Sequence, residues 1–166
     1  MEKKKSDNKT IENEILKNIK IAVEKIEKKF YSIISINGEE RIRERVFCYE
    51  LYHQLRLIEF NYKFDIHGEL VKAGFYNINV IPDFLFHKQG SDDNYCIMEV
   101  KGELDSNGIY KDFKTLSKFL GKQKEIKAYK LAIFLLFNQS LEAFINFLKR
   151  NGKVTNLDKY SEKIII

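Results

Sequence analysis

The sequence predicts an α/β (α+β) fold with a central mixed β-sheet flanked by helices and an additional N-terminal amphipathic helix. Helical periodicity covers residues 10–33 and resumes at 39–60, and shorter β-rich runs begin at residue 62. A Lys-rich helical segment then leads into the apolar run LAIFLLF at 131–137. A chain of 166 residues can bury one core of ordinary size, so we expect a single domain over residues 1–166.

The first two helices are predicted from apolar residues at three- and four-residue steps. Lys and Glu separate the apolar residues of the first helix, which are Ile11, Ile15, Ile19, Ala22, Ile26 and Phe30. This pattern predicts an amphipathic helix over residues 10–33, after a charged tail at 1–9. Asn37-Gly38 breaks the pattern, and a second helix is predicted over 39–60.

The rest of the chain is predicted to form a three-strand meander, a helix, a strand and a final helix. The meander strands are expected at 62–71, 76–86 and 95–101, and the single proline, Pro82, falls inside the second of them, as at a bulge or bend. We expect a helix over 109–129, a buried strand over 131–137, a helix capped by Ser140, and an edge strand at 164–166. The core then spans residues 40–138, and a C-terminal helix and tail span 139–166.

Composition limits the class of protein. Hydrophobic residues make up 44% of the chain and charged residues 32%, which excludes a disordered chain. The net charge of +5 is spread along the sequence and favours a polyanionic partner only weakly. The two cysteines are too few for a disulfide-stabilised secreted domain, so we expect a cytoplasmic setting. Neither a membrane span nor an export signal is evident.

The candidate chemistry lies in IPDFLFHKQGSDDNYCIMEVKG, residues 81–102. Because side chains alternate along a strand, Glu99 and Lys101 are expected on one face and their neighbours on the other. If the preceding strand pairs with this one through the loop at 88–94, Asp83 lies beside Glu99. Two carboxylates and one ammonium group would then share one site.

Such a group suits phosphodiester hydrolysis with Mg²⁺ (or Mn²⁺), since hard oxygen ligands hold the cation and the lysine orients water or stabilises phosphoryl charge. The alternative is structural, because an acid-x-Lys strand is very often a solvated face with a weak ion pair. Pro82 favours the functional interpretation, because it interrupts strand hydrogen bonding where Asp83 begins an apolar run.

The order of these features resembles the PD-(D/E)xK nuclease superfamily, which includes restriction endonucleases, junction resolvases and repair nucleases. The resemblance rests on a helix with Glu50, then Pro82-Asp83, then Glu99-Val100-Lys101, then a Lys-rich helix. More narrowly, RVFCYELYHQLR (45–56) and DFKTL (112–116) look like segments of small, mostly uncharacterised bacterial members. The resemblance covers about residues 40–138 and implies a restriction-endonuclease-like core.

The resemblance also implies residue roles. Asp83 and Glu99 would be metal ligands and Lys101 the catalytic lysine. Glu50 would be a further catalytic and metal-binding acid from the first core helix, and it borders the apolar face of that helix, where a solvated glutamate is less expected.

Two further sets of residues could bind phosphate or metal. Lys111, Lys114 and Lys118 recur at helical spacing and form either a phosphate-binding stripe or a solvated face. The chain's three histidines are too scattered in sequence to suggest a zinc site.

The expected function is divalent-metal-dependent hydrolysis of nucleic acid, with DNA as the expected substrate and bacterial defence or DNA processing as the setting that the family suggests. The alternative is a nucleic-acid-binding or regulatory subunit that has a nuclease-like fold but is inactive or needs a partner protein to cut. A third hypothesis is an interaction protein that uses the N-terminal helix and binds no nucleic acid. That helix could also form the seam of a homodimer, although packing on its own domain is the simpler use.

Overall fold

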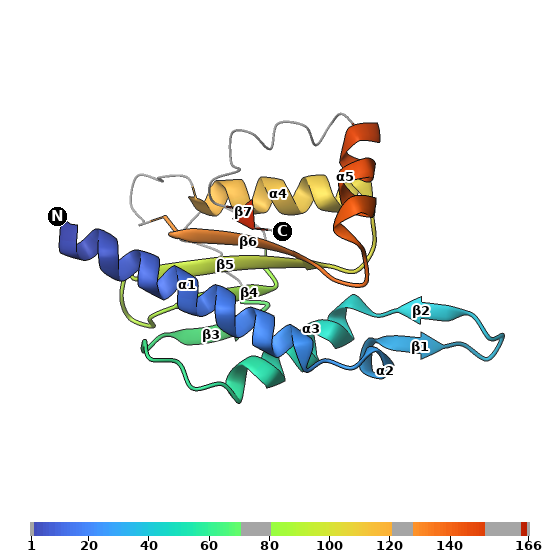
Figure 1. The fold of residues 1–166 in the computed structure, drawn as a ribbon, viewed down its shortest axis with the longest axis horizontal. Helices are drawn as coiled ribbons and strands as arrows, with labels where there is room; N and C mark the ends of the chain where they lie inside the picture. Colours follow the sequence, from blue (N-terminus) through green and yellow to red (C-terminus); the bar gives the residue numbers. More distant parts are fainter. Residues whose placement is uncertain (1, 71–80, 121–127, 152–163, 166) are drawn as a thin grey trace.

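The computed structural model describes residues 2–70, 81–120, 128–151 and 164–165, which form an α+β fold around a mixed sheet (Figure 1). The strand order is β3-β4-β5-β6-β7. Strands β3, β4 and β5 form the predicted antiparallel meander, whereas β5, β6 and β7 run parallel. The strands of this sheet are β3 (Asp65–Gly68), β4 (Phe84–His87), β5 (Asn94–Lys101), β6 (Leu131–Leu136) and β7 (Ile164–Ile165).

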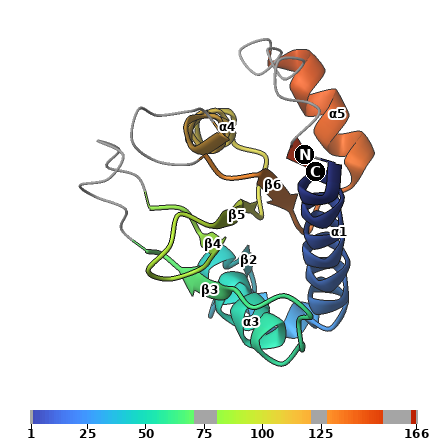
Figure 2. The same cartoon turned by 90° about the vertical axis from the view of Figure 1, so that its left-hand side faces the viewer.

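Helices cover both faces of this sheet (Figure 2). On one face, α1 (Glu2–Glu24) and α3 (Glu44–Arg56) pack against alternate residues of β5, including Met98 and Val100. On the other face, α4 (Ser106–Leu120) and α5 (Leu141–Arg150) pack around Ile97 and Phe134. Helix α4 connects β5 to the parallel strand β6, as a parallel pair requires. The α4 face of β5 is the face that carries Glu99 and Lys101.

The N-terminal helix differs in its bounds from the prediction. Helix α1 begins at Glu2 and ends at Glu24, so a charged tail at 1–9 and one helix over 10–33 are both wrong. A separate turn of helix follows as α2 (Lys28–Tyr31). The predicted apolar face is confirmed for Ile11, Ile15, Ile19, Ala22 and Ile26, which are buried in the core with α3 and the sheet, but it is wrong for Phe30, which is exposed on α2. The apolar face of α1 is therefore used within its own domain, and a dimer seam through it is not supported.

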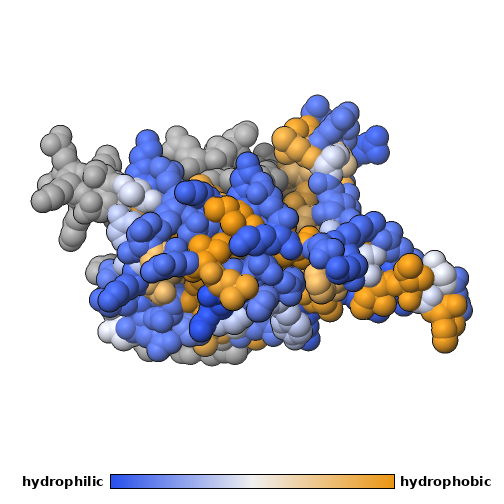
Figure 3. Space-filling model, turned by 60° about the horizontal axis from the view of Figure 1, so that its bottom comes forward, coloured by the Kyte–Doolittle hydropathy of each residue, from blue (hydrophilic) through white to orange (hydrophobic). Residues whose placement is uncertain are grey.

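A hairpin replaces the end of the first predicted helix, at residues 32 and 33, and the start of the second. Strands β1 (Ser32–Ile34) and β2 (Glu40–Ile42) pair in an antiparallel two-stranded sheet, and α3 begins only at Glu44. Gly38 has a φ of +79°, which favours glycine, and Asn-Gly is a frequent hairpin sequence. The hairpin projects from the domain, and its tip is hydrophobic where Ile34 and Ile36 are exposed (Figure 3).

The later elements follow the prediction more closely. Strand β4 begins at Phe84, so Pro82 precedes the strand and does not lie inside it. Ser140 caps α5 as predicted, because its Oγ accepts a hydrogen bond from the Ala143 amide at 3.1 Å. The predicted strand at 164–166 is confirmed for Ile164 and Ile165. Parts of the predicted strands at 62–71 and 76–86 and of the helix at 109–129 fall on residues 71–80 and 121–127, which lie outside the described residues.

Within the described ranges, no helix is both long enough and apolar enough to cross a lipid bilayer. Cys48 is a partly buried free thiol and Cys96 is a fully buried one. Burial raises the pKa of both thiols, so neither is activated as a nucleophile.

Candidate active site

The pairing of β4 with β5 brings Asp83 and Glu99 together. Phe84 pairs with Met98, so Asp83 lies opposite Glu99 at the end of the ladder. The Asp83 amide donates a hydrogen bond to Glu99 Oε2 at 3.4 Å, and Asp83 Oδ2 accepts one from the Val100 amide at 2.7 Å. The predicted adjacency of the two acids is therefore confirmed.

The backbone at Asp83 is fixed from the β3 side as well. The Asp83 carbonyl accepts a hydrogen bond from the Glu69 amide at 3.2 Å, just beyond the end of β3. Pro82 has no amide proton, so the regular strand begins only after Asp83. The Asp83 side chain then bonds to the backbone of β5, which orients its carboxylate toward the end of that strand.

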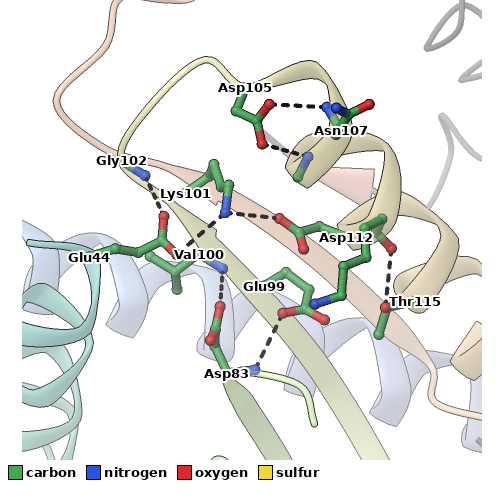
Figure 4. A network of polar contacts seen from close by, with 12 residues as sticks. Glu44, Asp83, Glu99, Val100, Lys101, Gly102, Asp105, Asn107, Asp112 and Thr115 are labelled. Atoms are coloured by element: carbon green, nitrogen blue, oxygen red, sulfur yellow. Dashed lines mark hydrogen bonds and ion pairs between the residues drawn. The ribbon is translucent and has the colours of Figure 1, made fainter. Parts of the chain in front are cut away.

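Lys101 lies between two helices, as Figure 4 shows. Its Nζ is 3.4 Å from Glu44 Oε1 on α3 and 3.7 Å from Asp112 Oδ2 on α4. The other oxygen of Glu44 accepts a hydrogen bond from the Gly102 amide at 3.1 Å. A side chain at Gly102 would clash, because a Cβ there would lie 2.6 Å from the ring of Phe137. The glycine therefore permits the close packing that brings Glu44 to the end of β5.

The site holds more negative than positive charge. Four carboxylates, from Glu44, Asp83, Glu99 and Asp112, share this region with two ammonium groups, those of Lys101 and Lys111. Burial, then the charges of Asp83 and Asp112, raise the pKa of Glu99 to about 9. Burial raises the pKa of Asp112 to about 6, although Lys101 opposes this shift.

The pKa values of Asp83 and Lys101 also shift. Burial raises the pKa of Asp83, although its hydrogen bond from Val100 opposes the shift. For Lys101, burial lowers the pKa, but Asp112 and Glu44 outweigh burial and raise it overall. The raised pKa values of Asp83, Glu99 and Asp112 favour their protonated forms, and the raised pKa of Lys101 favours its charged form, as expected where carboxylates outnumber cations.

Glu50 is not part of this cluster. Its carboxylate accepts a hydrogen bond from Gln54 Nε2 at 2.7 Å, one turn along the same helix. Glu50 lies six residues after Glu44, which is about 240° around the helix and about 9 Å along it. The helical acid that approaches Lys101 is therefore Glu44, in place of the predicted Glu50.

Sequence reasoning missed Glu44 and Asp112 as members of the site. Glu44 was hidden because the β1–β2 hairpin was interpreted as the start of a helix, so that the first turn of α3 was not identified. Asp112 carried a usable signal, because it shares helical spacing with the buried residues Ile109, Phe113 and Leu116. A carboxylate on the buried face of a helix requires a compensating group, and here that group is Lys101.

The remaining candidates divide into two groups. Lys111, Lys114 and Lys118 are all exposed on α4, and Lys111 also lines the recess beside Asp83 and Glu99. The structure brings together two histidines that are distant in sequence, since His67 Nδ1 lies 2.9 Å from His87 Nε2 across the β3–β4 pair. Gln89 Nε2 lies 3.0 Å from the other nitrogen of His67.

An open recess of about 310 Å³ gives access to the acidic cluster. Its walls include Asp83, Glu99, Lys101 and Asp112. Among the residues that the structure describes, no three His, Cys, Asp or Glu side chains are already arranged to hold a metal ion. The predicted ligand set of Asp83, Glu99 and Glu50 is thus not preassembled, although its first two members are adjacent.

Three parts of the fold contribute to this site. Helix α3 supplies Glu44, the β4–β5 hairpin with its preceding residue supplies Asp83, Glu99 and Lys101, and α4 supplies Asp112. No family model, no curated protein and no solved structure matches the chain, so its function must be inferred from these residues.

Proposed function

We propose that this chain is a divalent-metal-dependent nuclease that hydrolyses phosphodiester bonds of nucleic acid. The observation that carries the proposal is the pairing of half-buried Asp83 with buried Glu99 beside the ammonium group of Lys101, in a recess open to a substrate. Two carboxylates and a lysine at the end of adjacent strands form a group that can act on a metal-activated water and a phosphate.

The residues present fit a Mg²⁺ or Mn²⁺ ion. Asp83 and Glu99 would hold it, because Mg²⁺ is usually bound through one or two carboxylates and keeps several of its waters. Asp112 Oδ2 is buried and has no hydrogen-bond partner among the described residues, although it forms an ion pair with Lys101 at 3.7 Å. When bound, such an ion would lower the pKa of a coordinated water and neutralise charge on the phosphoryl oxygens.

The protein's own groups then have separate tasks. Lys101 remains charged and can orient the attacking water or donate to a phosphoryl oxygen. Glu44 and Asp112 restrain its ammonium group from opposite sides, which limits its freedom before substrate binds. The hydrogen bond from the Val100 amide restrains the Asp83 carboxylate in the same way.

The order of the elements supports the family expectation. Helix α3, the Asp83 segment, strand β5 and the Lys-bearing helix α4 follow one another as in the PD-(D/E)xK resemblance. DNA is the expected substrate, and bacterial defence or DNA processing the expected setting, because of that resemblance. Lys111, Lys114 and Lys118 would bind phosphates on the exposed face of α4.

One observation favours the alternative of a binding or regulatory subunit. Because the described residues include no preformed group of three metal ligands, the site could require a partner protein to complete it before cutting. Such a protein would bind nucleic acid on its own but cleave nothing.

A cleavage panel distinguishes these two functions. Plasmid, linear, branched and single-stranded substrates are incubated with Mg²⁺, Mn²⁺ or a chelator, with Asp83→Asn as the matched control. The nuclease proposal predicts cleavage of at least one substrate that requires the cation and is lost in the variant. Binding without cleavage under every condition would favour the regulatory subunit.

A further inference from the structure

Three neighbouring recesses adjoin α3. The first, of about 310 Å³, is the candidate active site, which lies on the α4 side of the sheet and reaches α3 only at Glu44. The second, of about 380 Å³, shares Glu44 and Asp83 with it, and the third, of about 520 Å³, includes Arg56 at the other end of the helix. Glu44 and Arg56 are separated by about 18 Å of helix, a length that corresponds to about five stacked nucleotides.

The middle recess offers an aromatic surface beside the acidic cluster. Tyr49 lines it and is 62% exposed, and Arg45 lies one helical turn before it. Tyr52 is fixed deeper in the recess, because its hydroxyl donates a hydrogen bond to the Ile66 carbonyl at 3.3 Å. An exposed tyrosine ring at the mouth of a recess can stack on an unpaired base, and this contact tolerates any base.

The far recess is basic. Arg56, Lys63 and Lys88 line it and are exposed. None of these three side chains forms an ion pair within the described part of the chain. Asp65 also lines this recess and accepts a hydrogen bond from the Gln89 amide at 3.1 Å, so three cationic side chains accompany one carboxylate. The far recess therefore has positive charge available for phosphate groups.

We infer that this row of recesses is a binding groove for a single strand of nucleic acid that leads into the candidate active site. Along the groove, the far recess offers cations for the phosphates of the strand, and the middle recess offers an aromatic surface for a base. The groove then ends at the acidic cluster, where cleavage would occur. Each recess holds only a few hundred cubic ångströms, so a base can enter one only when it is unpaired. The inference rests on the proposed function, since it names the substrate class of that same site.

The test measures binding in chelator, where no cleavage occurs. Anisotropy of labelled dodecamers of thymidine and of uridine, and of a blunt DNA duplex, is compared for the wild type and for Arg56→Gln/Lys63→Gln/Lys88→Gln. The expected result is about a tenfold or greater loss of single-strand affinity, with the salt slope reduced by about 0.7 for each lost phosphate contact. Tyr49→Ala should also weaken single-strand binding about tenfold while leaving the salt slope unchanged.

The matched control is Lys17→Gln/Lys20→Gln/Lys25→Gln, which removes the same charge from exposed positions that line none of the three recesses. It should change single-strand affinity less than about threefold. Equal losses in the two triple variants, or duplex binding as tight as single-strand binding, would overturn the inference. If the groove substitutions weaken single-strand binding but the wild type cleaves no substrate, only the nuclease proposal is wrong. If the wild type cleaves but the groove substitutions leave binding unchanged, only this inference is wrong. The thymidine and uridine strands decide between DNA and RNA.

Discussion

Lys101 on β5 and Asp112 on α4 form an ion pair in which Nζ and Oδ2 are 3.7 Å apart. Their side chains are only 18% and 13% exposed, so the pair is partly shielded from water. A charge in such a place is costly without a partner, and Lys101 has two carboxylate partners, Asp112 and Glu44. The position of the candidate catalytic lysine is thereby linked to the packing of α4 on the sheet.

Replacing Asp112 tests this positioning role. Asp112→Asn keeps the shape of the side chain but removes its charge, so Lys101 loses one of its two restraints. Turnover is expected to fall about 10- to 100-fold while KM changes less, because the substrate contacts remain. Thermal stability in chelator should not fall, since the variant removes a buried acid whose pKa is raised. Unchanged turnover would exclude the positioning role, and partial rescue by Asp112→Glu would support it.

Glu44 and Glu50 form a matched pair of acids on one helix. Glu44→Gln removes the ion pair with Lys101, so metal-dependent cleavage should fall at least about tenfold. Glu50→Gln should change cleavage less than about twofold, because Glu50 contacts Gln54 and not the cluster. Cleavage rates of the two variants on one substrate check this expectation. If Glu50→Gln lost cleavage and Glu44→Gln did not, the acid that α3 supplies to the site would be Glu50.

Stability of the metal-free protein should depend on pH through Glu99. The folded state binds the Glu99 proton more tightly than the unfolded state does, because its pKa is raised from 4.5 to about 9. Stability should therefore decrease as the pH rises through that interval, by at most about 1.4 kcal/mol per pH unit for this group. Urea unfolding in chelator at several pH values measures the slope. Glu99→Gln should flatten it, and a wild-type stability that rose over the same interval would contradict the assigned shift.

The basic residues of α4 make a separate prediction about nucleic-acid affinity. Lys111→Gln/Lys114→Gln/Lys118→Gln should weaken binding at low salt and reduce the salt slope by up to about one per lost phosphate contact. All three side chains are exposed, so the fold should not change. Titrations at several salt concentrations provide the measurement, and an unchanged slope would identify these lysines as a solvated face.

Much of the sheet and its flanking helices could be predicted because the signals are local. The apolar run at 131–137 and the cap at Ser140 correspond closely to β6 and α5. Alternation along β5 placed Glu99 and Lys101 on one face, and a short loop allowed Asp83 to be placed beside Glu99. The relative positions of Asp83, Glu99 and Lys101 could therefore be predicted from the sequence, because all three belong to one pair of neighbouring strands or the residue before it.

The remaining site residues depend on packing between distant segments. Glu44 reaches Lys101 only because α3 crosses the end of β5, and Asp112 reaches it only because α4 folds back over the sheet. The hairpin at Ser32–Ile34 and Glu40–Ile42 was missed although Asn37-Gly38 favours one, because isoleucines at helical spacing suggested a helix. The periodicity of apolar residues in one sequence does not distinguish a helix from a strand when the segment is short.

The most direct measurement of the central claim is the cleavage rate of Asp83→Ala, Glu99→Ala and Lys101→Ala, alone and combined, with Mg²⁺ present. Each single variant is expected to lose cleavage by about two orders of magnitude or more while remaining folded, because the three side chains act on one water and one phosphate. The triple variant should then be little slower than the slowest single variant. Near-normal turnover in any two single variants, or effects that multiply in the triple variant, would contradict a shared catalytic site.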